Sequence, residues 1–326
     1  MFDLDQFCHN LMIVIGIIMY IFGLIGCVSN IYVFTKWSFS TRNPTDPYRK
    51  VRLNNSSLYL LTTAIANLIL IIYPLAVRII VDGFGYLVTD SNEIFLCRIR
   101  YYILQTSVMI SLICTCLATF DRYLITSRTV RLRHLSASRH LTKQIILFVV
   151  ILTNLHSIPT AIYYNRSRVY DCTISLLIYA NYYLYFVVVF LYGIFPICFL
   201  SIFGSLTYKN LRTLKRTDNN GNLIRDKQLS EMILFQCIAL VFSYIPYCIQ
   251  QIYFSKINLL NGPPTSFDLL FRIVTIILFY INPVTSFYIF FISIPNFRRQ
   301  IKSIVLCQDH HVVNRIYPLT IVNDGG

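Results

Sequence analysis

The stretch Cys97–Tyr123, CRIRYYILQTSVMISLICTCLATFDRY, decides the fold of this chain. It begins with a cysteine, continues through mostly apolar residues and ends in Asp121-Arg122-Tyr123. A helix from Cys97 to Arg122 rises about 37 Å, slightly more than the roughly 30 Å hydrocarbon core of a bilayer. An ionic pair at the end of such a helix is costly unless it has a partner and a use. The stretch therefore predicts a membrane-spanning helix with a cysteine at one water interface and a charged pair at the other.

The composition of the whole chain agrees with a membrane protein. Hydrophobic residues make up 56% of the 326 residues and charged residues only 13%, and the mean hydropathy is +0.60. A soluble domain carries about 25% charged residues. The apolar residues form seven blocks long enough to span a bilayer, at 11–35, 57–81, 99–121, 144–164, 179–207, 231–254 and 267–294. The first block follows Asp3 and Asp5 rather than a basic segment, so we expect it to be retained and not cleaved as a signal peptide.

The charge distribution predicts the orientation of the chain. If the N-terminus lies outside, most of the 28 Lys and Arg residues fall in the inner loops and the tail. The exceptions lie in outer loops or at outer helix ends: Arg78, Arg98, Arg100, Arg166, Arg168, Lys256 and Arg272. This follows the positive-inside rule and predicts a multi-pass protein with an extracellular N-terminus. An anionic inner leaflet explains the basic loops better than nucleic acid, because the charges are divided among short loops.

Several positions are candidates for covalent modification. Cys97 and Cys172 both fall on the outer side, in an oxidising compartment, and can pair. Asn165-Arg166-Ser167 is a glycosylation acceptor pattern on the same side. After Pro295, the segment NFRRQIKSIVLC is typical of a short amphipathic helix on the inner leaflet. Cys307 at its end is a palmitoylation candidate, and an unmodified tail cysteine is the alternative.

Taken together, these features resemble the rhodopsin-like (class A) G-protein-coupled receptors. Single elements of the resemblance occur by chance, but each falls in the expected span at the expected depth. The set comprises Asn30, Asn67, Cys97, Asp121-Arg122-Tyr123, Cys172, Pro196, Pro246 and Asn282-Pro283. The resemblance implies an all-α membrane protein, a seven-transmembrane helix bundle with a short amphipathic eighth helix. It implies an extracellular N-terminus over 1–10, a seven-transmembrane receptor domain over 11–306 and a cytoplasmic tail over 307–326, in the plasma membrane.

The resemblance also implies roles for individual residues. Cys97 and Cys172 would form the disulfide that ties an outer loop to the third span. Arg122 would pair with Asp121 and with Asp226 in the inactive state, and would turn toward a heterotrimeric G protein in the active state. Tyr123 belongs to the same switch triplet as Asp121 and Arg122. Tyr244 and Pro246 would form the pivot of the sixth span, and Asn282-Pro283 would allow the seventh span to rearrange. Polar side chains inside the bundle seek partners on neighbouring helices, which predicts an internal network of Asn30, Asn67, Ser111 and Asn282.

The chain departs from the family pattern at several positions. Its only tryptophan is Trp37, so the sixth-span position that usually carries Trp holds Tyr244. The second span holds Asn67 where the family usually has Asp, which predicts a weak or absent internal sodium site. Ser286 stands where a Tyr usually follows the Asn-Pro pair. These departures affect the details of activation more than the fold.

The ligand class is the least determined feature. Leu104 occupies the position where receptors for amines carry Asp, and the seventh span has no Lys for a retinal Schiff base. The candidate pocket consists of Arg78, Leu104, Gln105, Gln250, Gln251 and Arg272. Such amides, aromatic residues and charges suit a short or amidated peptide, as in invertebrate neuropeptide (FMRFamide-like) receptors. A chemosensory receptor for small molecules is the alternative.

Other function classes find little support in the sequence. A transporter or channel would need ionisable residues at mid-membrane depth or an inverted repeat, and the middles of the spans hold amides and one histidine, His156. We see no catalytic constellation and no metal-ligand spacing, so we expect no enzyme activity, no metal and no cofactor. We expect His156 to be a packed neutral histidine rather than a proton relay.

Overall fold

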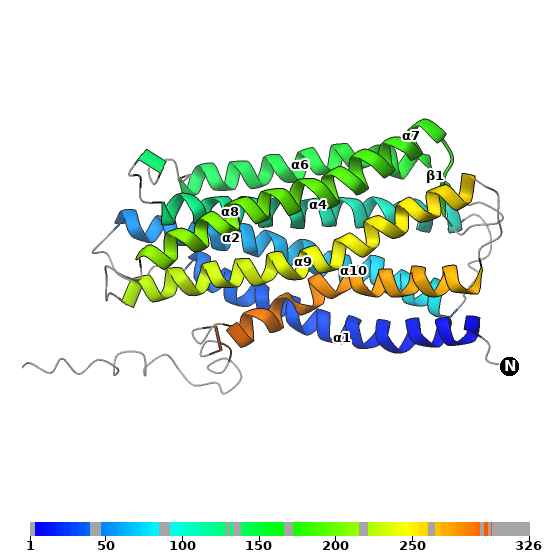
Figure 1. Ribbon diagram of the computed structural model, residues 1–326, viewed down its shortest axis with the longest axis horizontal. Coiled ribbons are helices and arrows are strands. Elements are labelled where there is room, and N and C mark those ends of the chain that lie inside the picture. The colour runs from blue at the N-terminus through cyan, green and yellow to red at the C-terminus, as the bar shows by residue number, and fades with distance from the viewer. Residues whose placement is uncertain are drawn as a thin grey trace, which may run out of the picture.

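The computed structural model describes residues 4–39, 47–84, 92–127, 129, 131–132, 138–165, 172–214, 221–259, 265–293, 297–298 and 301. Long helices lie side by side in one elongated bundle (Figure 1). We call the end that carries Leu4 and the β1–β2 hairpin the outer end, and the opposite end the inner end. These names follow the orientation that the charge distribution predicts.

The elements follow one another along the chain with few strands. The helices that contain the spans are α1 (Leu4–Phe39), α2 (Pro47–Leu70), α3 (Ala76–Arg78), α4 (Asn92–Thr126), α6 (Arg139–Tyr163), α7 (Leu177–Tyr182), α8 (Phe195–Leu214), α9 (Gly221–Leu259) and α10 (Ser266–Ser293). Wider π-helical turns interrupt two spans, at η1 (Ile71–Leu75), η2 (Ile79–Gly83) and η3 (Tyr183–Ile194). The strands β1 (Tyr164–Asn165) and β2 (Thr173–Ile174) form an antiparallel hairpin, with Tyr164 opposite Ile174.

Within the described residues, seven helical segments are long and apolar enough to cross a membrane, which confirms the predicted bundle. They are Leu4–Ser38, Asn55–Gly83, Leu96–Thr126, Arg139–Tyr163, Leu177–Asn210, Leu234–Ser255 and Ser266–Ile292. Each overlaps one of the apolar blocks in the sequence. The small hairpin was not expected, because two-residue strands leave no periodic pattern of apolar residues.

The third span, α4, is the most enclosed helix of the bundle. In its most apolar window, 72% of the residues are buried, compared with 22% for α6. It contacts α2, α6, α8 and α9. Apolar side chains of α6 such as Phe148 and Leu155 remain exposed, as expected for a helix that faces lipid. The stretch that dominates the sequence therefore also occupies the centre of the structure.

Prolines lie inside several spans, and one of them, Pro74, coincides with a π-helical turn. Pro74 lies within η1, and Pro246 and Pro283 lie inside α9 and α10. Proline has no N–H to donate and its ring displaces the preceding turn, so wider turns and bends are common beside it. The second span therefore reaches the outer end as two π-helical turns around the short α3, which aim Arg78 and Asp82 into the bundle, where both are buried.

The predicted eighth helix and Cys307 fall largely outside the described residues. Phe297, at the start of that segment, is fully buried against Phe34, Trp37 and Phe290. This contact fixes the beginning of the segment beside α1 and α10. The amphipathic helix and the palmitoylation of Cys307 stay predictions, as do the boundaries of the terminal segments and the glycosylation of Asn165.

Gly26 allows α1 and α10 to approach closely, and its replacement tests this packing. A Cβ at Gly26 would lie 3.0 Å from Phe287 Cβ and 3.5 Å from the Val284 carbonyl oxygen. Forcing a methyl group into a packed interior typically costs about 1–3 kcal/mol. We expect Gly26→Ala to lower the apparent melting temperature of the purified protein. Gly193→Ala is the matched control, because its Cβ would make an ordinary 3.4 Å contact. Equal effects of the two variants would contradict the packing.

Candidate functional site

A disulfide and the hairpin build the outer end around α4. Cys97 and Cys172, 75 residues apart, are joined, which confirms the disulfide that the resemblance implies. Beside it, the Arg98 Nε donates a hydrogen bond to the Tyr164 carbonyl over 3.0 Å. The rings of Tyr101 and Tyr164 stack at 4.0 Å. These contacts fix β1 and β2 against the first turns of α4.

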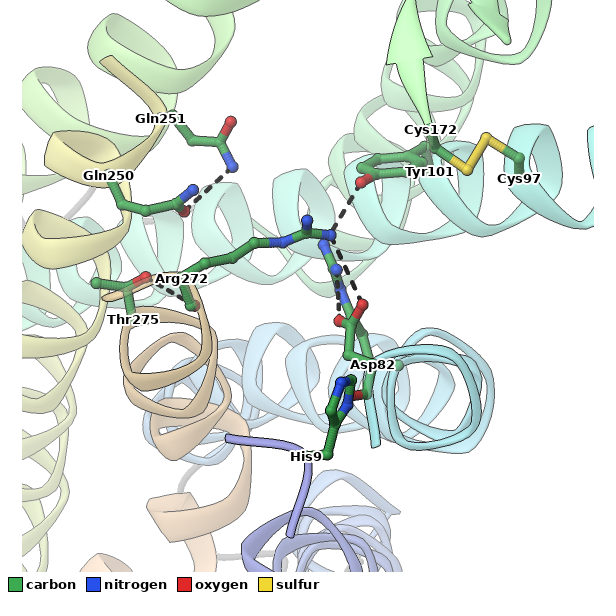
Figure 2. Close-up of polar contacts among 10 residues, drawn as sticks. His9, Asp82, Cys97, Tyr101, Cys172, Gln250, Gln251, Arg272 and Thr275 are labelled. Carbon is green, nitrogen blue, oxygen red and sulfur yellow. Dashed lines mark hydrogen bonds and ion pairs between the residues drawn. A yellow bond between two sulfur atoms is a disulfide. The ribbon is translucent and has the colours of Figure 1, made fainter. Parts of the chain in front are cut away.

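Below the hairpin, ionic side chains from three helical segments meet inside the bundle (Figure 2). Asp82 accepts from Arg78 through Oδ2 at 2.6 Å, and its Oδ1 lies 3.6 Å from Arg272 Nη2. The Arg78 Nη2 also donates to the Tyr101 hydroxyl at 3.4 Å. His9 Nδ1 donates to the Asp82 carbonyl oxygen at 2.7 Å, which ties α1 to η2. A carboxylate between guanidinium groups is the arrangement that makes buried charge tolerable.

Arg100 completes what we call the outer ionic cluster, the residues Arg78, Asp82, Arg100 and Arg272. Arg100 is 3% exposed, lies over the Tyr101 ring at 5.2 Å and is electrostatically coupled to Arg78 and Asp82. Its Nε has no hydrogen-bond partner in the described part of the chain. The buried Tyr280 hydroxyl of α10 also finds none there, and it is coupled to Arg78 and Arg100. The cluster therefore holds three cations and one anion among its described members.

The structure brings together only part of the predicted ligand pocket. Arg78 and Arg272 meet through Asp82, whereas Gln250 and Gln251 form a separate pair on α9 at 3.4 Å. Leu104 is buried in the apolar core. Arg100 and Tyr280 were not among the predicted pocket residues. The four-residue spacing of Arg78 and Asp82 signals their pairing, but nothing in the sequence distinguishes a buried Arg100 from one that reaches water.

Gln105 faces α6 in the described conformation. It is fully buried, donates to His156 Nδ1 at 3.2 Å and accepts from the Thr160 hydroxyl. His156 Nε2 contacts the Tyr182 hydroxyl at 2.9 Å. Because Nδ1 accepts and Nε2 donates, the imidazole in this arrangement is neutral. The predicted role of Gln105 in ligand binding stays a prediction, and in this structure it joins α4 to α6, while His156 joins α6 to α7.

The four predicted members of the internal polar network each have a partner, but the described bonds divide them into pairs. Ser111 donates to Asn67 at 2.8 Å between α4 and α2. Asn30 donates to Ser286 at 3.2 Å between α1 and α10. Gln236 donates to Asn282 at 3.0 Å between α9 and α10. Ser286 and Gln236 were not predicted as partners, because the sequence does not fix which faces of two helices meet.

At the inner end, the Asp121-Arg122-Tyr123 triplet is enclosed. Asp121 accepts a hydrogen bond from Ser56 of α2, and Arg122 is 1% exposed. Tyr123 lies against Phe203 of α8, with ring centroids 5.4 Å apart. The side chain of Asp226 falls outside the described residues, so its pairing with Arg122 stays a prediction.

Aromatic rings and prolines separate the two polar ends. Tyr244, two residues before Pro246, is buried and lies 5.1 Å from Phe279 and 6.2 Å from Tyr192, measured between ring centroids. Tyr247 contacts Phe279 at 4.5 Å. Tyr244 thus fills the predicted pivot position with a smaller ring than tryptophan. Among the described residues, no group of three or more His, Cys, Asp or Glu side chains is placed to hold a metal ion.

Comparison with known families gives a match over most of the chain. Residues 48–286 match the family described as 7 transmembrane receptor (rhodopsin family). This region includes the outer ionic cluster, the disulfide and Asp121-Arg122-Tyr123. It also includes Pro246 of the sixth span and Pro283 of the seventh. A search of curated proteins finds no significant match.

Removing either cysteine of the disulfide tests how the hairpin is held. We expect Cys97→Ser and Cys172→Ser to lower the apparent melting temperature of the purified protein equally, because each breaks the same bond. Native disulfides contribute about 2–4 kcal/mol in most proteins. The double variant should be no less stable than either single variant, since the two changes remove one interaction. Additive losses in the double variant would contradict this account.

Proposed function

The chain belongs to the rhodopsin family of seven-transmembrane receptors, and on that premise we propose that it transmits an extracellular signal to a heterotrimeric G protein. It is a multi-pass membrane protein. We place it in the plasma membrane with the N-terminus outside, because the basic residues gather in the loops of the inner end. The ligand enters from the outer end, and the G protein binds at the inner end.

One observation carries this proposal: α4 places a buried charged site at each end of the bundle. At the outer end it contributes Arg100 and Tyr101, and at the inner end Asp121 and Arg122, all within the same 35-residue helix. Buried ionisable groups in a membrane protein are costly and usually mark functional sites. Two such sites on one enclosed helix support a receptor that couples an outer ligand to an inner partner.

The coupling works as a shift between two conformations. A ligand that binds more tightly to the conformation with an open inner end increases the population of that conformation. The size of this shift is set by the difference between the ligand's affinities for the two conformations. Pro246 and Pro283 lie where α9 and α10 can bend, and Tyr244 and Phe279 pack between them. We take the described conformation as the resting one, because Arg122 is too buried to contact a G protein.

For the ligand class, we favour a short peptide over a small chemosensory molecule. The outer end offers guanidinium groups, the amides of Gln250 and Gln251 and several tyrosines. A peptide presents amides, charged groups and apolar side chains that match such a surface. A chemosensory receptor of the same fold is the second candidate.

Arg122→Ala tests the inner site. We expect this variant to reach the cell surface but to lose at least about 90% of G-protein activation, since Arg122 supplies the charge that the G protein meets. The measurement is second-messenger output in cells that also express a promiscuous Gα subunit, with surface expression measured in parallel. Signalling that survives the substitution at normal surface levels would refute the assigned role.

Ser56→Ala tests whether Ser56 holds Asp121 in the resting conformation. A hydrogen bond to a charged group contributes about 1.5–3 kcal/mol, so losing it should raise ligand-independent signalling several-fold. Ser57→Ala is the matched control, because the neighbouring Ser57 hydroxyl contacts Ser38 at 3.0 Å. If the two variants have the same basal output, Ser56 does not restrain the switch.

A further inference from the structure

The outer ionic cluster carries more positive than negative charge among its described residues. Arg78, Arg100 and Arg272 are all electrostatically coupled to Asp82. The Oδ2 of Asp82 pairs with Arg78, and its Oδ1 pairs with Arg272. The carboxylate that α10 carries, Asp268, has other partners, because it accepts hydrogen bonds from Thr265 and Tyr253. One carboxylate therefore faces three guanidinium groups, two of which it pairs with.

Arg100 is the guanidinium that Asp82 leaves open. Its side chain is buried, its Nε lacks a partner, and the described part of the chain gives it no ion pair. Its described contact is the ring of Tyr101, whose hydroxyl already accepts from Arg78. A buried guanidinium without an anion is strongly disfavoured. A chain that only needed to fold would gain stability by replacing it.

The surroundings of Arg100 suit the binding of a carboxylate. The planar guanidinium donates two parallel hydrogen bonds to a carboxylate, which gives both strength and orientation. The Tyr280 hydroxyl of α10 is a second buried polar group without a described partner, and it lies within electrostatic range of Arg100. Figure 2 shows the Arg272 side chain reaching from α10 toward Asp82, and this side chain is 27% exposed, so its positive charge attracts an approaching anion. The single positive charge of Arg100 matches the single negative charge of one carboxylate.

We propose that the ligand of this receptor carries a carboxylate group, and that this group pairs with Arg100 inside the outer ionic cluster. The inference rests on the proposed function, since it names the chemistry of the ligand at that same site. Three sources present the same chemistry: the free C-terminus of a peptide, an acidic side chain, and a small organic acid. A neutral amide lacks the charge that Arg100 requires, so the proposal disfavours a ligand recognised through an amidated terminus alone.

The first test needs no ligand. Arg100→Met keeps an unbranched apolar side chain and removes the guanidinium with its charge, so we expect a higher apparent melting temperature for the purified, unliganded protein in lipid nanodiscs. Arg98→Met is the matched control, two residues away on α4. Its loss should destabilise the protein, because Arg98 Nε donates to the Tyr164 carbonyl at 3.0 Å. A lower melting temperature for Arg100→Met would mean that Arg100 serves the fold, and it would overturn the proposal.

The second test uses matched probes. A library of tetrapeptides without acidic side chains is made twice, once with free C-termini and once as C-terminal amides. A second pair of libraries contains C-terminal amides with either Asp and Glu or Asn and Gln. A third pair contains linear monocarboxylic acids and their primary amides. The pair in which only the acid raises the melting temperature of the wild-type protein identifies the source of the carboxylate.

Arg100 variants then assign the effect to this residue. Losing one partner of a buried charge pair typically weakens binding by about 30-fold or more. We expect Arg100→Gln to weaken the acid by that factor and to leave its amide unchanged, and Arg100→Lys to keep part of the preference. Equal stabilisation by acids and amides, no stabilisation by any acid, or an equal loss for both in Arg100→Gln would overturn the proposal.

Signalling separates this inference from the proposed function. If acids and amides activate the G protein equally, and Arg122→Ala abolishes both responses, the results support the receptor function and refute the carboxylate site. If acids stabilise the protein in an Arg100-dependent manner but never activate a G protein, the results support the carboxylate site and refute the proposed coupling to a G protein.

Discussion

Burying ionic groups inside a bundle that is surrounded by lipid is the constraint on which this structure depends. Charged side chains in such an environment must pair with one another or with a ligand. Asp82 satisfies this requirement at the outer end by accepting from Arg78 and facing Arg272, which joins the second and seventh spans. Asp121 does so at the inner end by accepting from Ser56, which joins the second and third. The arrangement of these helices follows from the pairs.

The region between the two charged ends is apolar, aromatic and interrupted by proline. Tyr244, Tyr247 and Phe279 pack between α9 and α10, where Pro246 and Pro283 remove regular hydrogen bonds. Packed interiors tend to have discrete arrangements rather than to deform continuously, so a small change at one end can select a different arrangement at the other. The separate polar pairs, such as Ser111 with Asn67, hold the helices in register without making one rigid network.

The sequence predicts the spans and the disulfide well, because both depend on local features. Apolar length defines a span, and the resemblance supplies the cysteine pair. The partners of buried polar residues depend instead on how each helix is rotated about its axis. The bonds by which Gln105 joins α4 to α6, for example, could not be read from the sequence. Asn30 and Asn282 bond to Ser286 and Gln236, which were not anticipated. Arg100 was overlooked because an arginine near a helix end commonly reaches water, whereas here it is buried beside Tyr101.

The most direct test of the central claim is the distance between the inner ends of α6 and α9. Spin labels at His140 and Phe235, introduced as noncanonical amino acids, would report this distance by pulsed electron resonance in nanodiscs. If α9 opens the inner end, a saturating nucleotide-free G protein should shift the distance distribution outward by several ångströms, because a partner that binds only the open conformation raises its population. An unchanged distribution in a complex that demonstrably contains the G protein would contradict the account.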